Sequence, residues 1–396
     1  MSVPRSRASA FAAAFLAVTV IATGCGGHPA SNGQTSATPT TAPTSASPAA
    51  SSSAGPSATA QPSLPAAPAS FRTSSVTFVS SNEAFCLGTA PGHGTLVVRT
   101  LDRGQTWARL AAPLAPLGSP GSGASSAVWG TRFASASLGF VFGDRLWQTA
   151  DGGRHWALAG APAGQILSLA AIDGQVLALV AKGSGPARLL RRSLAGGPWV
   201  QIASVKTVDA LDPTDLIATQ AGTAAVLSGT SVLVSTNGGL SLTSRATPSV
   251  PGFAPDSVAV TSSHALALLL VGQGAAGSTE KVVYTSPDSG AHWAKAGTPS
   301  NEGDPVTLAG GSPTGLVLAT ASGASWLDRS NNGGHSWATV LTYGDGGEGW
   351  ADLGFTTTTN AVVVHGPADS AGNSDGRPAR LLLSANGGAT WQPVSF

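Results

Sequence analysis

A recurring turn pattern, the apolar segments between its copies and the lack of capped helical periodicity together predict an all-β chain. The pattern occurs seven times between residues 100 and 391, and its third positions are 42 to 54 residues apart. That period is the length of one four-stranded blade. The sequence therefore predicts a seven-bladed β-propeller of four-stranded antiparallel blades, preceded by a signal peptide and a disordered Ser/Thr/Ala/Pro linker.

The chain begins with a short basic start and an apolar run. Arg5 and Arg7 precede the run from Ala8 to Ala22, which suits a signal peptide and is shorter than the roughly 20 residues that span a bilayer. The following Thr23-Gly24-Cys25 resembles the lipobox of bacterial lipoproteins, although Ala22 stands where that family usually has Leu. The resemblance implies cleavage before Cys25 and a lipid on its thiol. This lipid would anchor the protein to the cell membrane, on the extracytoplasmic side. The alternative is an ordinary secretory signal.

The next segment is rich in Ser, Thr, Ala and Pro and has no formal charge between His28 and Ser70. Such a composition buries too little apolar surface to offset chain entropy, so a disordered tether is expected. The other cysteine, Cys86, lies in an apolar stretch and is expected to be buried without a disulfide partner. The expected organisation is a signal peptide over 1–24, a lipid-anchored linker over 25–70 and the propeller over 71–396.

Charged residues make up 10% of the chain, against about 25% in an average protein. The formal charge is +1, and it falls to −1 without the two arginines of the signal. This balance excludes a basic field for nucleic acid. No Cys/His ligand spacing occurs, and the Gly-rich run 272–277 leads into a strand rather than a helix, so no metal or other cofactor is expected. We expect a monomer whose partners are the membrane, through Cys25, and an envelope protein or glycan.

The repeated eight-residue pattern, here called the repeat turn, has Ser/Thr first, Asp/Asn third, Gly fifth and Trp eighth. Ser/Thr and Asp/Asn side chains accept hydrogen bonds from backbone N–H groups, Gly supplies a positive φ, and Trp packs between sheets. Two copies are eroded, one with Leu242 in place of Trp and one with Ala195 in place of the acceptor. The defining positions are Asp102, Trp107, Asp151, Trp156, Asn237, Asp288, Trp293, Asn332, Trp337, Asn386 and Trp391.

The repeat turn resembles the Asp box, Ser/Thr-x-Asp-x-Gly-x-Thr-Trp, of the sialidase-like BNR propellers. In that family the box lies between the third and fourth strands of a blade, far from the active site, so the resemblance implies a structural role for these residues. The unit from Leu138 to Trp156 is also similar to non-catalytic BNR lipoproteins and photosystem II assembly and stability factors. A non-catalytic binding or scaffold protein of the cell envelope is therefore expected.

The alternative function is a glycoside hydrolase, either sialidase-like or another glycan-cleaving propeller. Sialidases of this family use three arginines, a Tyr–Glu pair and an acidic Asp. Here the first-strand arginine motif survives only as Phe71-Arg72-Thr73-Ser74, and neither Tyr284 nor Tyr343 has a recognisable glutamate partner motif. The acidic clusters at 209–215 and 345–352 are read as solvated loop charge. No catalytic residue is therefore assigned.

Binding is expected on the side of the propeller opposite the repeat turns, where the longest loops of an antiparallel blade gather. The segment 343–352 combines two aromatic residues and three carboxylates among glycines. Trp129 precedes an innermost strand as Trp350 does, so both indoles are expected at the channel mouth, either stacking on a ligand or plugging the channel. The predicted ligand face consists of Trp129, Tyr343, Asp345, Glu348, Trp350 and Asp352.

Overall fold

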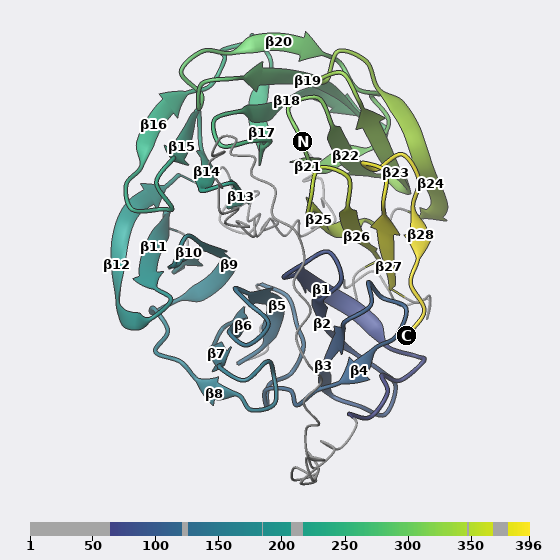
Figure 1. Cartoon of the computed structure of the whole chain (residues 1–396). Coiled ribbons are helices and arrows are strands. Elements are labelled where there is room, and N and C mark those ends of the chain that lie inside the picture. Colours follow the sequence, from purple (N-terminus) through teal and green to yellow (C-terminus); the bar gives the residue numbers. More distant parts are fainter. Residues whose placement is uncertain (1–63, 121–125, 184, 207–216, 347, 367–378) are drawn as a thin grey trace, which may run out of the picture. The chain divides into compact units, whose positions relative to one another are not determined.

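The computed structural model describes residues 64–120, 126–183, 185–206, 217–346, 348–366 and 379–396. These residues form 28 β-strands in seven four-stranded antiparallel sheets, which are arranged as blades around a ring (Figure 1). The predicted seven-bladed propeller is thereby confirmed. In the same ranges there is no helix with the length and apolar character needed to cross a bilayer.

Each blade uses four consecutive strands, from the innermost at the channel to the outermost at the wall. Blades 1 and 2 contain β1 (Arg72–Phe78), β2 (Ala84–Thr89), β3 (Thr95–Thr100), β4 (Ala108–Arg109), β5 (Val128–Phe133), β6 (Gly139–Gly143), β7 (Leu146–Thr149) and β8 (Ala157–Leu158). Blades 3 and 4 contain β9 (Gln165–Ile172), β10 (Gln175–Ala181), β11 (Ala187–Ser193), β12 (Gly196–Val205), β13 (Ala218–Gln220), β14 (Thr223–Ser228), β15 (Ser231–Ser235) and β16 (Thr243–Ala246).

The remaining three blades follow the same order. Blades 5 and 6 contain β17 (Ala254–Val260), β18 (Leu266–Ala275), β19 (Ser278–Ser286), β20 (Ala294–Gly297), β21 (Asp304–Gly310), β22 (Leu316–Ala321), β23 (Gly323–Ser330) and β24 (Ala338–Gly346). Blade 7 contains β25 (Trp350–Phe355), β26 (Ala361–His365), β27 (Arg380–Ser384) and β28 (Gln392–Pro393). The Gly-rich run 272–277 lies in a paired extension of β18 and β19, with its turn at Ala276–Gly277.

The core is divided among the seams between neighbouring blades. Seven clusters of buried apolar side chains are found, one at each seam of the ring. Because both faces of a blade are covered by its neighbours, the second strands are apolar on both sides, as in β10 (QVLALVA). Cys86 is buried in β2 with a free thiol, as predicted, and burial raises its pKa.

The ring closes between blades 7 and 1 without exchange of a strand, because β1 is innermost and β28 is outermost. The segment Pro65–Ala67 pairs with the outer edge of β4, where Ala67 N–H donates to Trp107 O (2.9 Å). The ring of Phe396 lies 4.7 Å from that of Phe71 and 4.9 Å from that of Trp107, centroid to centroid. Both ends of the described propeller therefore meet at this closure seam.

Every repeat turn lies between the third and fourth strands of its blade. In the first copy, Thr100 Oγ1 donates to Asp102 Oδ1 (2.7 Å) and accepts from Gly104 N–H (2.8 Å), while Asp102 Oδ1 also accepts from Thr106 N–H (2.9 Å). Gly104 has a φ of 85°. Partial burial raises the pKa of Asp102, but these hydrogen bonds outweigh it and lower the pKa. Matching bonds occur around Asp151, Asn237, Asp288, Asn332 and Asn386.

The repeat turns share one rim of the propeller with the turns between the first and second strands. In blade 1, Arg103 N–H donates to Asn82 O (2.8 Å), and equivalent bonds of 2.6 to 3.0 Å occur in blades 2, 4, 5, 6 and 7. We call this side the repeat-turn rim. The opposite rim carries the hairpins between second and third strands and the connections between blades, as the strand order requires.

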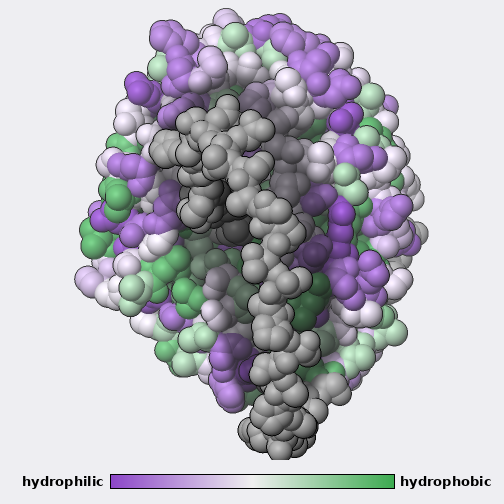
Figure 2. All heavy atoms as spheres, viewed as in Figure 1, coloured by the Kyte–Doolittle hydropathy of each residue, from purple (hydrophilic) through white to green (hydrophobic). Residues whose placement is uncertain are grey.

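The outermost strands vary in length from two to ten residues, and the longest is β12. Its sequence contains no charged residue, and apolar residues gather over it at the left of Figure 2. Two register shifts against β11 and Pro198 interrupt the strand. Such irregularities hinder the addition of a further strand to a sheet edge.

Candidate functional site

The predicted ligand segment crosses the seam between blades 6 and 7 on the opposite rim. Tyr343 lies in β24, the outermost strand of blade 6, while Trp350 and Asp352 lie in β25, the innermost strand of blade 7. Glu348 is half-buried in the connection, and the side chain of Asp345 lies outside the described part of the chain. Trp350 and Asp352 are therefore buried, whereas Tyr343 and Glu348 are half-buried.

Trp350 is a core residue. Its side chain is 1% exposed, and its Nε1 donates to Thr320 O of blade 6 (3.0 Å). The reason is that β25 begins at Trp350, which pairs with His365 inside the sheet instead of remaining in the Gly-rich connection. The indole therefore fills the seam and does not offer a stacking face to a ligand, which excludes the first of the two expected roles.

Asp352 is also buried, and it forms an ion pair with Arg132 of blade 2 (Oδ1 to Nη2, 3.4 Å). Its Oδ2 accepts a hydrogen bond from Val76 N–H of blade 1 (2.5 Å), so one carboxylate joins blades 7, 1 and 2. Burial raises the pKa of Asp352, and Arg132 and the Val76 N–H oppose that rise. With both side chains at most 1% exposed, this pair has a structural position and is closed to substrate.

Trp129 belongs to a different part of the molecule. It lies in β5 of blade 2, is 7% exposed, and packs in the apolar cluster between blades 2 and 3. Its Nε1 is buried and has no hydrogen-bond partner among the described residues. The structure does not bring Trp129 and Trp350 to one site.

A stack of side chains leads from this core to the surface at the seam of blades 6 and 7. The Tyr343 ring stacks on His365 with centroids 4.3 Å apart, and His365 lies 4.8 Å from Trp350. The Arg380 guanidinium, from the residue that pairs with His365 in the sheet, also lies over the Tyr343 ring, 5.4 Å from its centroid. We call Tyr343, His365 and Arg380 the rim cluster.

The three side chains of the rim cluster differ in their exposure to solvent. His365 is buried, Tyr343 is half-buried and Arg380 is exposed, and no described carboxylate forms an ion pair with Arg380. An arginine held over an aromatic ring keeps its N–H donors directed outward for a ligand. Sequence reasoning missed His365 and Arg380, which are paired in neighbouring strands of blade 7 but stand apart in the sequence and carry no motif.

Two of the residues considered for hydrolase chemistry, Asp352 and Arg72, lie in innermost strands. The channel carboxylate Asp352 is buried and paired, and Arg72, the echo of the sialidase arginine, is half-buried in β1. Within the described ranges no three His, Cys, Asp or Glu side chains are grouped to hold a metal. The acidic cluster at 209–215 lies outside the described residues.

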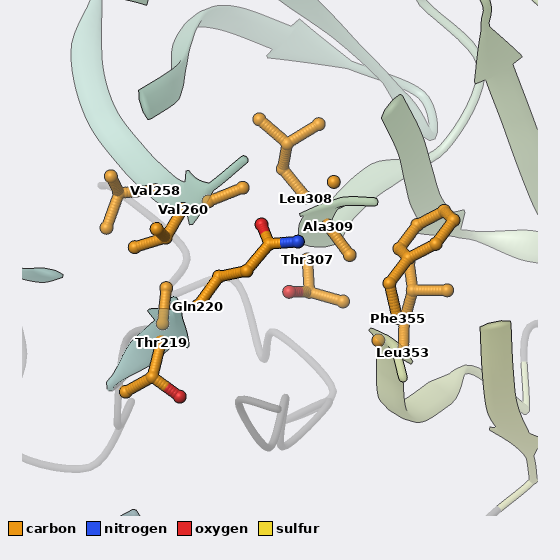
Figure 3. Close-up of a pocket in the computed structure, with 13 residues that line it drawn as sticks. Thr219, Gln220, Val258, Val260, Thr307, Leu308, Ala309, Leu353 and Phe355 are labelled. Carbon is orange, nitrogen blue, oxygen red and sulfur yellow. The ribbon is translucent and has the colours of Figure 1, made fainter. Parts of the chain in front are cut away.

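A pocket lies in the central channel, on the half nearer the repeat-turn rim (Figure 3). It is lined by the innermost strands β13, β17, β21 and β25 of blades 4 to 7. Sequence reasoning did not single out its residues, because they are short apolar stretches that carry no recognisable motif. The pocket and the rim cluster lie toward different ends of the channel strands.

A buried lysine joins blade 5 to the connection that leads into blade 6 on the opposite rim. Lys281 lies in β19 and is 2% exposed. Burial lowers its pKa to about 8, although the carboxylates of Asp328 and Asp304 raise it. Its Nζ donates hydrogen bonds of 3.0 to 3.1 Å to the backbone carbonyls of Thr279, Ser300 and Glu302.

The free energy of unfolding is expected to rise between pH 8 and pH 10 because of Lys281. Its pKa is about 8 in the folded chain and about 10.4 in an unfolded one, so in this interval the unfolded chain binds more protons. Stability then increases with pH, by on the order of 3 kcal/mol across the interval. Denaturant unfolding at several pH values should show this rise in the wild type and not in Lys281→Met. Equal pH slopes in both proteins would show that Lys281 titrates alike in the two states.

The chain matches no protein-family model and no curated protein. Its fold is similar to a structure of YCF48 bound to D1 peptide, with a TM-score of 0.54, 15% identity, and coverage of 82% of this chain and 95% of that chain. YCF48 from Cyanidioschyzon merolae has a TM-score of 0.53, 15% identity, and coverage of 82% and 97%. Oligogalacturonate lyase in complex with manganese has a TM-score of 0.51, 11% identity, and coverage of 77% and 86%. At these identities the likeness shows the fold alone.

Proposed function

We propose that this protein is a non-catalytic binding or scaffold protein outside the cell membrane, tethered through lipid on Cys25, and that it binds an envelope protein through the opposite rim. The anchor rests on the signal-like start and the Thr23-Gly24-Cys25 sequence. Two or more acyl chains on one cysteine make a stable membrane anchor. The propeller then serves as the rigid body that presents the binding surface.

The rim cluster is the observation that carries the binding proposal. Arg380 and Tyr343 combine an exposed guanidinium with an aromatic ring, and both residue types are enriched where proteins bind partners. They sit on a seam supported from below by His365 and the buried Trp350. A cation held in this way favours a partner segment that carries a carboxylate.

The likeness to YCF48 supports a peptide segment as the ligand. One of the similar structures is of YCF48 bound to D1 peptide, so a propeller of this shape accommodates a peptide. The partner proposed for the present chain is accordingly an extended, acidic segment of an envelope protein.

The proposal is tested with the Cys25→Ser chain, which should leave the membrane fraction and become soluble. That protein, immobilised, is expected to capture envelope proteins, and Arg380→Gln is expected to weaken capture about five- to thirtyfold, as for loss of a contact worth 1–2 kcal/mol. Arg145→Gln is the matched control, because Arg145 is an exposed arginine on a second-to-third-strand hairpin of blade 2. The Arg145→Gln variant should capture envelope proteins as well as the Cys25→Ser parent does.

Two outcomes would contradict the proposal. If the Cys25→Ser protein stayed in the membrane fraction, the proposal of a lipid anchor on Cys25 would be wrong. Equal capture by the parent, Arg380→Gln and Arg145→Gln proteins would show that the rim cluster takes no part in binding. Thermal unfolding of each variant separates loss of binding from loss of fold, since Arg380 is exposed and its substitution should leave the melting temperature nearly unchanged.

A further inference from the structure

The channel pocket has an uncharged lining. The innermost strands of blades 4 to 7 contribute Val258, Val260, Leu308 and Phe355, together with the polar but neutral Gln220 and Thr307. No charged side chain is among its lining residues. An ion entering it would lose hydration without gaining a counter-charge, which is strongly unfavourable. The lining therefore selects against charged ligands.

Gln220 reaches across this pocket from β13 toward β21 (Figure 3). Its Nε2 donates to Gly311 O at the end of β21 (3.3 Å), so the side chain connects blade 4 with blade 6. That bond sets the orientation of the amide, because the reversed amide would bring two carbonyl oxygens together. The oxygen of the amide consequently faces the other way.

The amide oxygen of Gln220 is the unusual group of the pocket. Oε1 is buried and has no hydrogen-bond partner among the described residues. A buried acceptor without a donor is disfavoured, and a group that supplies the donor recovers that free energy. The oxygen points toward the apolar side chains of Val260 and Leu308, and Phe355 lies across the pocket on the side of the amide nitrogen.

We propose that this pocket is a second binding site, separate from the rim cluster, for an uncharged ligand that joins an apolar body to one N–H or O–H donor. The donor bonds Gln220 Oε1, and the apolar body packs on Val260 and Leu308. The pocket holds about 40 Å³, so it takes a small group such as a phenol or indole only in part, with the rest in the channel. A free small molecule and a tyrosine or tryptophan side chain of a partner share this chemistry.

The test compares three ring compounds of similar size on the full chain carrying Cys25→Ser. Phenol has an apolar ring and a donor, toluene lacks the donor, and benzoate carries a charge. In NMR titrations we expect phenol to bind about fivefold more tightly than toluene, the effect of one neutral hydrogen bond, and benzoate not to bind. Amide shifts at residues 218–220 and 307–310 locate the binding, and N-acetyl-tyrosinamide in a parallel titration tests the side-chain source.

Gln220→Met removes the acceptor at nearly constant size. It should lower the affinity for phenol about fivefold and leave that for toluene unchanged. The control is Gln201→Met, on the exposed outermost strand of blade 3, which should change neither. The proposal is overturned if phenol and toluene bind the Cys25→Ser parent alike, if phenol causes no shifts in the pocket, or if Gln220→Met binds phenol as the parent does.

Discussion

Replacement of Asp352 with alanine is expected to lower the free energy of unfolding by about 3–5 kcal/mol. Removal of the carboxylate leaves the Arg132 guanidinium buried without its counter-charge, and the Val76 N–H loses its acceptor. Asp352 also has a φ of 51°, a left-handed conformation that Asp and Asn tolerate better than Ala does. All three effects act at the point where blades 7, 1 and 2 are joined.

Denaturant unfolding of Asp352→Ala and Asp352→Asn checks this expectation. Asn keeps the shape and the left-handed backbone but not the charge, so the difference between the two variants separates strain from electrostatics. The control is Glu83→Ala, which breaks the more exposed Arg99–Glu83 pair (2.7 Å) and should cost about 1 kcal/mol. An Asp352→Ala protein no less stable than Glu83→Ala would mean that the buried pair contributes little to the ring.

Replacement of Trp350 with alanine is expected to cost about 3–5 kcal/mol, the range for a large core truncation. The indole is 1% exposed between blades 6 and 7, and its loss also removes the hydrogen bond to Thr320 O. The seam cannot collapse onto the cavity, because each blade is held by the next around the ring. A lower melting temperature should therefore accompany the loss.

Trp199→Ala provides the comparison for this variant. Trp199 lies on the outermost strand of blade 3 and is only half-buried, so its truncation should cost less than half as much. Both proteins are compared with the wild type by thermal and denaturant unfolding. If Trp350→Ala kept the wild-type melting temperature while losing partner capture, the indole would be a ligand contact after all.

The sequence predicted the fold well because the signals for it are local and repeated. Each repeat turn, such as Thr100–Trp107, contains its own hydrogen-bond acceptors within eight residues. The number of copies then gives the number of blades, and their spacing gives the length of each blade. The closure of the ring follows from where the first and last apolar strands lie relative to these turns.

The candidate site was less predictable because its contacts are distant in sequence. Arg132 and Asp352 are 220 residues apart, and nothing near either residue indicates the other. Trp350 stands beside a Gly-rich connection that reads as a loop, yet the adjacent blade decides its burial. The pocket around Gln220 likewise arises where four innermost strands converge, so no single stretch of chain encodes it.

The closure seam is also the place where tension on the N-terminal side enters the propeller. Pro65–Ala67 is bonded to β4 through Ala67 N–H and through Arg109 N–H, which donates to Pro65 O (2.6 Å). A pull along this segment loads both bonds in shear, so they must break together and not one after the other. Behind them, Phe71 is held against Phe396, so such a pull would strain the joint between first and last blades before it reached the channel strands.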